Sequence, residues 1–189
     1  MQQSMNPLTP EIWDRGLEYA EYRERVEKNA DVFDEVYDHP VYVEDDLKLL
    51  RRLPPLQVVV IGEDWCADVF HTMATWARVV EQLEGWSLRV FPRDQHLDLM
   101  ETFLWKGRAQ RIPVYAFFDQ RGYLQAWWSG RGRTAQAELD GFLQGRTFAA
   151  LDEDGKQSAR RVLNDGYRRE FRRTNFEEIL ALLRTFFHV

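Results

Sequence analysis

Cysteine is almost absent from this chain, since Cys66 is the only one among 189 residues. A single cysteine excludes an internal disulfide, which is typical of proteins in a reducing compartment, so we expect a cytoplasmic protein. Long apolar runs are also missing, because none approaches the roughly 20 residues that cross a bilayer. The N-terminal stretch MQQSMNPLTPEIW has neither a basic start nor an apolar segment. We therefore expect no secretory signal and no membrane partner.

Positive charge is in deficit. The formal net charge is −6 and 44% of the residues are hydrophobic, which predicts a globular protein rather than a general nucleic-acid binder. Residues 11–46 hold 13 acidic and 4 basic residues, a balance of −9, whereas residues 158–173 hold 6 arginines against 2 acids, a balance of +4. A solvated helix face, able to lie opposite the acidic segment, explains these arginines better than contact with RNA.

Patterns for metals and nucleotides are missing too. The segment Asp152–Gly155 lacks the ligand spacing and the final glutamate of a calcium loop. The segment Ser129–Gly132 does not follow the strand-to-helix pattern of a phosphate loop. The histidines form no ligand spacing with one another or with Cys66. We expect neither a metal nor a cofactor. The histidines are His39, His71, His96 and His188.

Apolar spacing predicts helices that alternate with strands. Thr9-Pro10-Glu11 is a helix start, because a hydroxyl cap precedes a proline and an acid, and Trp13, Leu17 and Ala20 continue one face of that helix. A single helix is expected to run from Cys66 to about Gly85. The other expected helices lie near residues 32–37, 46–53, 97–104 and 134–144. The expected strands are 57–61, 87–91 and the two arms of a hairpin around Gly122.

The order of these elements predicts an α/β fold. A strand–helix–strand unit implies parallel pairing through a right-handed crossover, and the hairpin adds an antiparallel part. We expect a mixed sheet of about four strands, covered by helices. Residues 1–53 would form a helical extension and 54–145 a core, with C-terminal helices at 146–189 packing on it. The last helix is expected to open on a capping box, Thr174-x-x-Glu177.

In its middle part the chain resembles the thioredoxin family. A buried strand leads into Trp65-Cys66 at a helix start, and Ile112-Pro113 follows 47 residues after Cys66. Gly122 lies in the hairpin turn, and Gly130 follows the last strand. Over about residues 54–145 these marks come in the family's order, which implies its three-layer fold with a cis bond before Pro113. The flanking strings GLEYAEYRERVEKNADVF, DDLKLLRRLPP and RDQHLDLM are similar to bacterial thioredoxin-like proteins with an N-terminal helical extension.

Two departures from the family motif concern its chemistry. The family motif Trp-Cys-Gly-Pro-Cys is here Trp65-Cys66-Ala67-Asp68-Val69, so the nucleophilic cysteine is kept and the resolving cysteine is replaced by Val69. Family members also carry a buried acid in the central strand that assists proton transfer. By spacing, Val60 stands at this place. The resemblance therefore implies no dithiol reduction of disulfides.

The position of Cys66 at a helix N-terminus favours its thiolate form, because backbone N–H groups and the helix dipole stabilise negative charge there. Arg108 and Arg111, which precede Pro113, are candidates to lower the thiol pKa further. Nearby acids, Asp68 among them, act in the opposite direction. We expect a modest lowering of the Cys66 pKa, with Cys66 as the catalytic candidate.

Two functions agree with these residues. A lone thiolate can form a mixed disulfide that an external thiol must resolve, or can serve as a redox sensor. Protein thiols or disulfides, or a small cellular thiol, would then be its partners. The resemblance also implies that Trp65, Ile112 and Pro113 could hold an extended peptide by strand addition. The alternative is a non-catalytic module that binds a protein partner through this cleft and its helical flanks. The helical extensions could also form a homo-oligomer.

Overall fold

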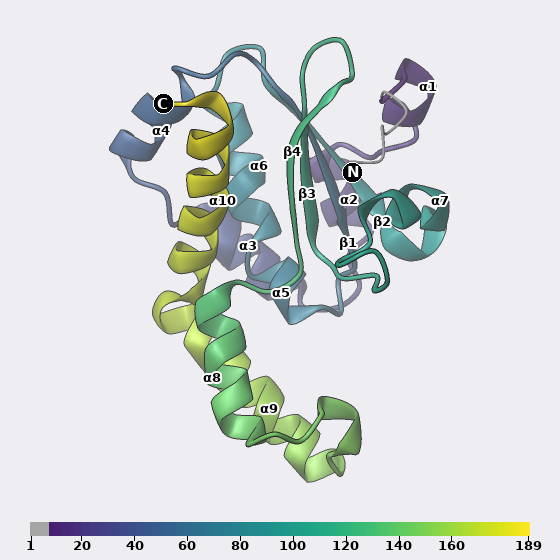
Figure 1. Cartoon of the computed structure of the whole chain (residues 1–189), viewed down its shortest axis with the longest axis vertical. Coiled ribbons are helices and arrows are strands. Elements are labelled where there is room, and N and C mark those ends of the chain that lie inside the picture. The colour runs from purple at the N-terminus through teal and green to yellow at the C-terminus, as the bar shows by residue number, and fades with distance from the viewer. Residues whose placement is uncertain (1–7) are drawn as a thin grey trace.

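The structure is a computed structural model that describes residues 8–189 (Figure 1). Residues 1–7, on which the expected absence of a secretory signal partly depends, lie outside the described residues. Among residues 8–189 no helix is long and apolar enough to cross a membrane.

A mixed four-stranded sheet forms the centre of the molecule, as predicted. Its strands lie in the order β2-β1-β3-β4, with β1 parallel to β2 and the other pairs antiparallel. Residues 58–61 of β1 are fully buried, which explains why this strand is an unbroken β-branched run rather than an alternation of apolar and polar residues. The strands are β1 (Gln57–Gly62), β2 (Ser87–Pro92), β3 (Val114–Phe118) and β4 (Leu124–Ser129).

Helices cover both faces of the sheet, which gives the three layers of the predicted fold. Figure 1 shows the sheet nearly along its edge, with α3, α6 and α10 on one side and α7 on the other. The inner face of α6 contributes Trp76, which packs against Tyr115 and Phe117 of β3 and Phe176 of α10. The helices around the sheet are α3 (Ala30–Asp38), α4 (Glu44–Leu50), α6 (Met73–Glu81), α7 (Leu97–Met100) and α10 (Arg172–Phe187).

The N-terminal helix is shorter than its apolar stripe suggests. The predicted cap is confirmed, because Thr9 accepts a hydrogen bond from the Ile12 N–H ahead of α1 (Pro10–Trp13). The single helix expected through Ala20 is wrong, since the chain leaves the helical path and resumes as α2 (Tyr19–Glu24). In between, Leu17 exchanges both backbone hydrogen bonds with Val90 at the edge of β2. Pairing with the sheet edge outweighs local helix propensity here.

The helix expected from Cys66 to Gly85 is interrupted after one turn. The structure has α5 (Ala67–Phe70), a break at His71–Thr72, and then α6. At the break the Thr72 hydroxyl donates to the Asp68 carbonyl at 2.6 Å and also bonds the Tyr115 hydroxyl at 2.6 Å. The side chain thus takes part in bonds that disturb the helical backbone pattern. The apolar spacing predicts the buried face correctly but not the break.

The C-terminal part forms an arm that projects from the core. The helices α8 (Arg133–Leu143) and α9 (Glu153–Gly166) pack side by side away from the sheet (Figure 1). Their contact encloses a small apolar cluster of its own, consisting of Leu139, Leu143, Leu151, Ala159 and Leu163. The division of the chain into folding units at residues 53 and 145 stays a prediction. In space, α8 lies with α9 in the arm, and α10 returns to the sheet.

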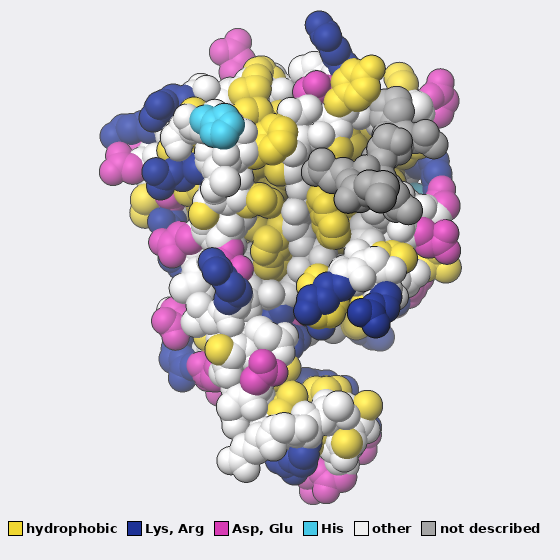
Figure 2. Space-filling model, in the orientation of Figure 1, with side chains coloured by type: hydrophobic (Ala, Val, Ile, Leu, Met, Phe, Trp, Pro, Cys, Tyr) yellow, Lys and Arg dark blue, Asp and Glu magenta, His cyan; other side chains and the backbone are white. Residues whose placement is uncertain are grey.

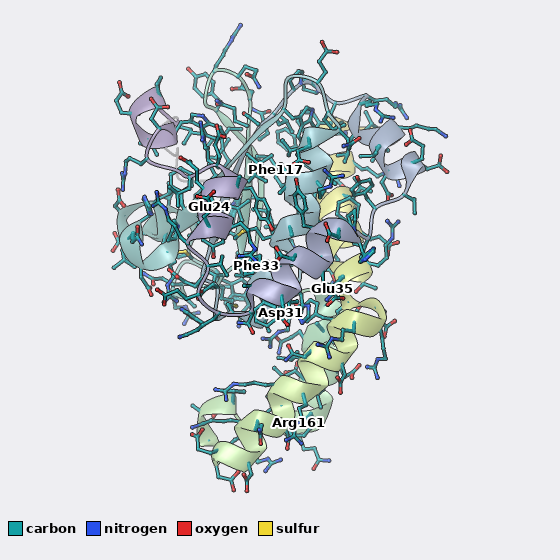
Figure 3. All side chains as sticks on the ribbon, turned by 180° about the vertical axis from the view of Figure 1, so that it is seen from behind. Glu24, Asp31, Phe33, Glu35, Phe117 and Arg161 are labelled. Carbon is teal, nitrogen blue, oxygen red and sulfur yellow. The ribbon has the colours of Figure 1, made fainter. Side chains whose placement is uncertain are left out.

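A π-helical turn joins the arm to the core. It spans Tyr167–Phe171 and runs without a break from α9 into α10. The predicted capping box at Thr174 is therefore wrong, because this position lies inside a continuous helix. Figure 3 shows Glu35 of α3 where the arm meets the core, and Arg161 farther out along α9. Such π turns rotate the side chains that follow them, and they are frequent at functional sites.

Candidate functional site

Cys66 lies where β1 passes into α5, opposite the loop that leads into β3. The Sγ atom of Cys66 lies 3.8 Å from the Ile112 carbonyl oxygen, to which the thiol can donate a weak hydrogen bond. The peptide bond between Ile112 and Pro113 is cis, which confirms the prediction from the sequence. Because β1 and β3 are neighbouring strands, their ends bring these two segments together although 46 residues separate them.

Trp65 is the exposed side chain of this site. It is 46% accessible to solvent, an unusually high value for a tryptophan, and Arg93 stands over its ring with 5.1 Å to the centroid. Ile112 and Pro113, in the loop that leads into β3, are buried. The structure thus brings Trp65, Cys66 and Ile112 together at one corner of the molecule, which we call the thiol corner. Their roles in holding a peptide stay a prediction.

The predicted lowering of the Cys66 pKa is wrong. Burial raises the pKa of the Cys66 thiol to about 12, and the negative charge of Asp68 acts in the same direction. The backbone N–H groups of Val69 and Asp68, and then the charge of Arg131, act against this rise without reversing it. A four-residue helix aligns few peptide dipoles, so its N-terminus gives the thiolate little support. The thiolate is therefore scarce at neutral pH.

Asp68 belongs to a buried ion pair beneath the thiol. Arg131 donates to both carboxylate oxygens of Asp68, at 2.9 and 2.7 Å, and the Tyr167 hydroxyl donates to one of them. The Asp68 side chain is only 7% exposed. Burial, together with the nearby charge of Asp68, raises the pKa of Tyr167 well above its ordinary value, so this hydroxyl stays protonated as a donor. Sequence reasoning missed Arg131 and Tyr167, since no spacing pattern connects them with Asp68.

The other two predicted tuning residues lie on the loop before Pro113. Arg108 is exposed, and the Arg111 guanidinium lies 3.5 Å from the centre of the Trp105 ring. The cation whose charge lowers the Cys66 pKa in the structure is Arg131, which follows Gly130. A tuning role for Arg108 and Arg111 stays a prediction that the geometry does not favour.

A second buried network begins at His71, at the break after α5. The Nδ1 atom of His71 accepts hydrogen bonds from Arg172, at 3.2 and 3.0 Å, and Arg172 also pairs with Glu35 at 2.8 Å. Since arginine can only donate, Nδ1 carries no proton and Nε2–H faces the Asn164 oxygen at 3.3 Å. Burial and then the charge of Arg172 lower the pKa of His71 to about 3. His71 is thus a neutral structural residue.

The sequence departures at Val69 and Val60 are both deep in the core. Each of these side chains is fully buried, so neither position offers a group that could reach a mixed disulfide on Cys66. Within residues 8–189, no three His, Cys, Asp or Glu side chains gather in a way that could hold a metal ion. The chemistry available at the thiol corner is therefore that of one thiol, an exposed indole and backbone groups.

Comparison with known proteins agrees with this architecture. A family model described as thioredoxin matches residues 16–143, so the chain belongs to the thioredoxin family. A search of curated proteins finds no match.

Two solved structures share the fold. One is a protein of unknown function from Pseudomonas aeruginosa, with a TM-score of 0.64 and 17% identity, covering 96% of this chain and 99% of that one. The other is an HIV epitope-scaffold, with a TM-score of 0.61 and 13% identity, covering 93% of this chain and 96% of that one. At such identities the likeness extends to the fold alone.

Proposed function

We propose that this thioredoxin-family protein is a binding module, which holds an extended segment of a partner protein at the thiol corner without catalysing disulfide exchange. The observation that carries this proposal is the fully buried Val69, one helical turn after Cys66. A mixed disulfide formed on Cys66 would have no second thiol in the chain to release it. The raised pKa of Cys66 adds a second obstacle, because the thiolate is the attacking species.

The backbone groups that could pair with a peptide have unused hydrogen-bonding capacity, although Ile112 itself is only 8% exposed. Among the described residues, no hydrogen bond uses the Ile112 N–H, and the Ile112 carbonyl receives only the weak bond from Cys66. Ile112 lies outside the β ladder, which begins at Val114. An extended segment could therefore pair with both backbone groups of Ile112 by strand addition. The exposed ring of Trp65 would supply an apolar contact beside it.

One observation favours slow monothiol exchange as a second candidate. The backbone N–H groups of Asp68 and Val69 act to lower the pKa of Cys66, as they would for an attacking thiolate. If a bound partner placed a disulfide beside Cys66, a small cellular thiol could complete the exchange. Such exchange would be slow, because burial and Asp68 outweigh these amides.

The pH dependence of Cys66 alkylation separates the two functions. For a binding module, the rate of reaction with iodoacetamide should be low at pH 7 and should still rise with pH above pH 9, since the thiol pKa lies near 12. Alkylation that reaches its plateau below about pH 8, the range of an activated cysteine, would contradict the proposal and favour monothiol exchange. Circular dichroism at each pH shows that the fold persists over the range used.

Asp68→Asn sharpens this measurement. Removing the negative charge should shift the alkylation profile to lower pH, because Asp68 is the second cause of the raised thiol pKa. Asp94→Asn is the matched control, at an exposed position whose backbone N–H bonds the Glu63 carboxylate. An unchanged profile in Asp68→Asn would show that burial alone sets the reactivity of Cys66.

A further inference from the structure

The loop before Ile112 carries a group of cations that the proposed function has not used. Backbone hydrogen bonds hold Trp105 to Ala109 in both directions, at 2.8 and 3.2 Å, so this loop has a defined shape. Lys106 and Gly107 complete its turn with positive φ angles of 51° and 68°. We call residues 105–111 the basic loop, because Lys106, Arg108 and Arg111 give it three positive charges and no acid.

These cations have no acidic partner among residues 8–189. Most other arginines of the chain form ion pairs, as Arg93 does with Asp94 close by, whereas the structure contains no ion pair of Lys106, Arg108 or Arg111. Instead, Lys106 and Arg111 lie against the Trp105 ring, at 4.3 and 3.5 Å from its centroid. The ring holds the two cations in place, and it leaves their charge free for a ligand.

The basic loop is continuous with the thiol corner. Its last residue, Arg111, directly precedes Ile112, whose carbonyl lies 3.8 Å from the Cys66 sulfur. Figure 2 shows Lys and Arg side chains gathered at the lower edge of the core, over the segment between α7 and β3, and the surface is hollowed between this edge and the tip of the arm. A chain paired with Ile112 would therefore pass beside the basic loop.

The side of the thiol corner before Trp65 carries acidic side chains instead of basic ones. Glu63 and Asp64 are the two residues before Trp65, and both accept backbone N–H groups, from Asp94 and from Glu27 and Lys28. A ligand that spans the corner thus meets positive charge at one end and carboxylates at the other. A short segment with its acids grouped at one end matches this arrangement of charges. A nucleic acid, which is negative along its whole length, would meet the carboxylates and the net charge of −6.

We propose that the partner segment is an acidic peptide whose carboxylates bind the basic loop while its neutral part pairs with Ile112. This proposal rests on the proposed function and adds the chemical class of the ligand. Because the loop has a fixed backbone and prearranged cations, little ordering is needed on binding. The interaction should weaken as the ionic strength rises, since exposed charges are screened.

Fluorescence anisotropy with designed peptides tests the proposal. The probe is a labelled peptide of alternating valine and threonine with a cluster of glutamates at one end, made in both orders, and its reference carries glutamines instead. We expect the glutamate peptide to bind more tightly than the glutamine peptide, by about fivefold to tenfold at low salt, as two or three exposed ion pairs supply. This preference should disappear at high salt.

The double variant Lys106→Gln with Arg108→Gln should cut the preference to about twofold, the share of the remaining Arg111. The fold should be unaffected, since both replaced side chains are exposed. The control variant, Arg121→Gln with Arg184→Gln, removes the same charge from exposed positions near the other end of the sheet. It should retain the full glutamate preference. A loop variant that keeps the full glutamate preference would overturn the proposal. The same holds for equal binding of the two peptides, or for no binding of either.

Two further outcomes would also overturn it. Tighter binding of a single-stranded oligonucleotide than of the glutamate peptide would assign the loop to nucleic acid. Self-association that the loop variant abolishes, seen by light scattering, would assign it to a second copy of this chain. The proposed function fails separately, through fast alkylation of Cys66 at neutral pH. Peptide binding without a glutamate preference would leave the proposed function standing and remove only the acidic ligand.

Discussion

The two sides of α5 differ in how completely their polar groups are paired. On the outer side, Cys66 makes one weak hydrogen bond and Trp65 is half exposed. On the inner side, Asp68 and His71 are buried and bonded to Arg131, Tyr167, Asn164 and Arg172. Charge buried without a partner is very unfavourable, whereas a neutral thiol and a half-exposed indole need no such pairing. The inner side therefore depends on its buried pairs for stability, whereas the thiol side does not.

Replacement of Asp68 by alanine should break the inner side most severely. The change leaves the Arg131 charge and the buried Tyr167 hydroxyl without their partner, so we expect the free energy of unfolding to fall by about 3–5 kcal/mol. Urea denaturation followed by circular dichroism measures this loss. Asp45→Ala, which removes an exposed pair with Lys48, should change the stability by less than about 1 kcal/mol. Similar losses in the two variants would refute the contrast between the two sides.

Acid should destabilise the protein through His71. The native state holds this imidazole neutral with a pKa of about 3, whereas the ordinary value is 6.5. Below pH 6.5 the imidazole of the unfolded chain binds a proton, whereas that of the native state does not. The free energy of unfolding therefore falls with pH, by about 1.4 kcal/mol per pH unit. From pH 7 to pH 5 the loss amounts to about 2 kcal/mol.

Urea denaturation at a series of pH values measures this dependence. His71→Gln should flatten it, because glutamine keeps a donor and an acceptor but binds no proton. His39→Gln, at an exposed position, should retain the slope of the unchanged protein. A slope that is the same in all three proteins would mean that His71 does not carry the effect.

The π-helical turn should tolerate no added methyl group at its start. A Cβ atom at Gly166 would collide with the buried Phe171 ring, whereas nothing lies near a Cβ at Gly141 of α8. Gly166→Ala should therefore cost about 1–3 kcal/mol. Gly141→Ala should stabilise by about 0.5–1 kcal/mol through helix propensity. Thermal unfolding of both variants tests the opposite signs, and stabilisation by Gly166→Ala would show that the turn can relax.

Trp65→Ala should have the smallest effect on stability. Because its ring is largely exposed, we expect a change within about 0.5 kcal/mol in urea denaturation. Peptide binding at the thiol corner should nevertheless weaken, since the ring is its main exposed apolar surface. Leu97→Ala, an equally exposed apolar side chain on α7, is the control. A large loss of stability in Trp65→Ala would place this tryptophan among the structural residues.

Much of the fold follows from local patterns in the sequence. The buried strand β1 and the hairpin with Gly122 in its turn were predicted from such patterns, and the cis bond before Pro113 from the resemblance to the thioredoxin family. The helix breaks were not, because they depend on partners far along the chain: Leu17 leaves its helix to pair with Val90, and Thr72 bonds Tyr115. For the same reason, apolar spacing does not predict the π turn at Tyr167.

The candidate site divides in the same way. The presence of one thiol beside Trp65, and the loss of its resolving partner to Val69, are properties of the sequence alone. The reactivity of that thiol is not, since burial and Asp68 raise its pKa against the expectation from the helix start. The number of thiols that can form a disulfide depends only on which residues the chain contains, and the sequence states this directly. The pKa of a group depends on its solvation and on charges brought near it by folding, so only the tertiary structure decided what Cys66 can do.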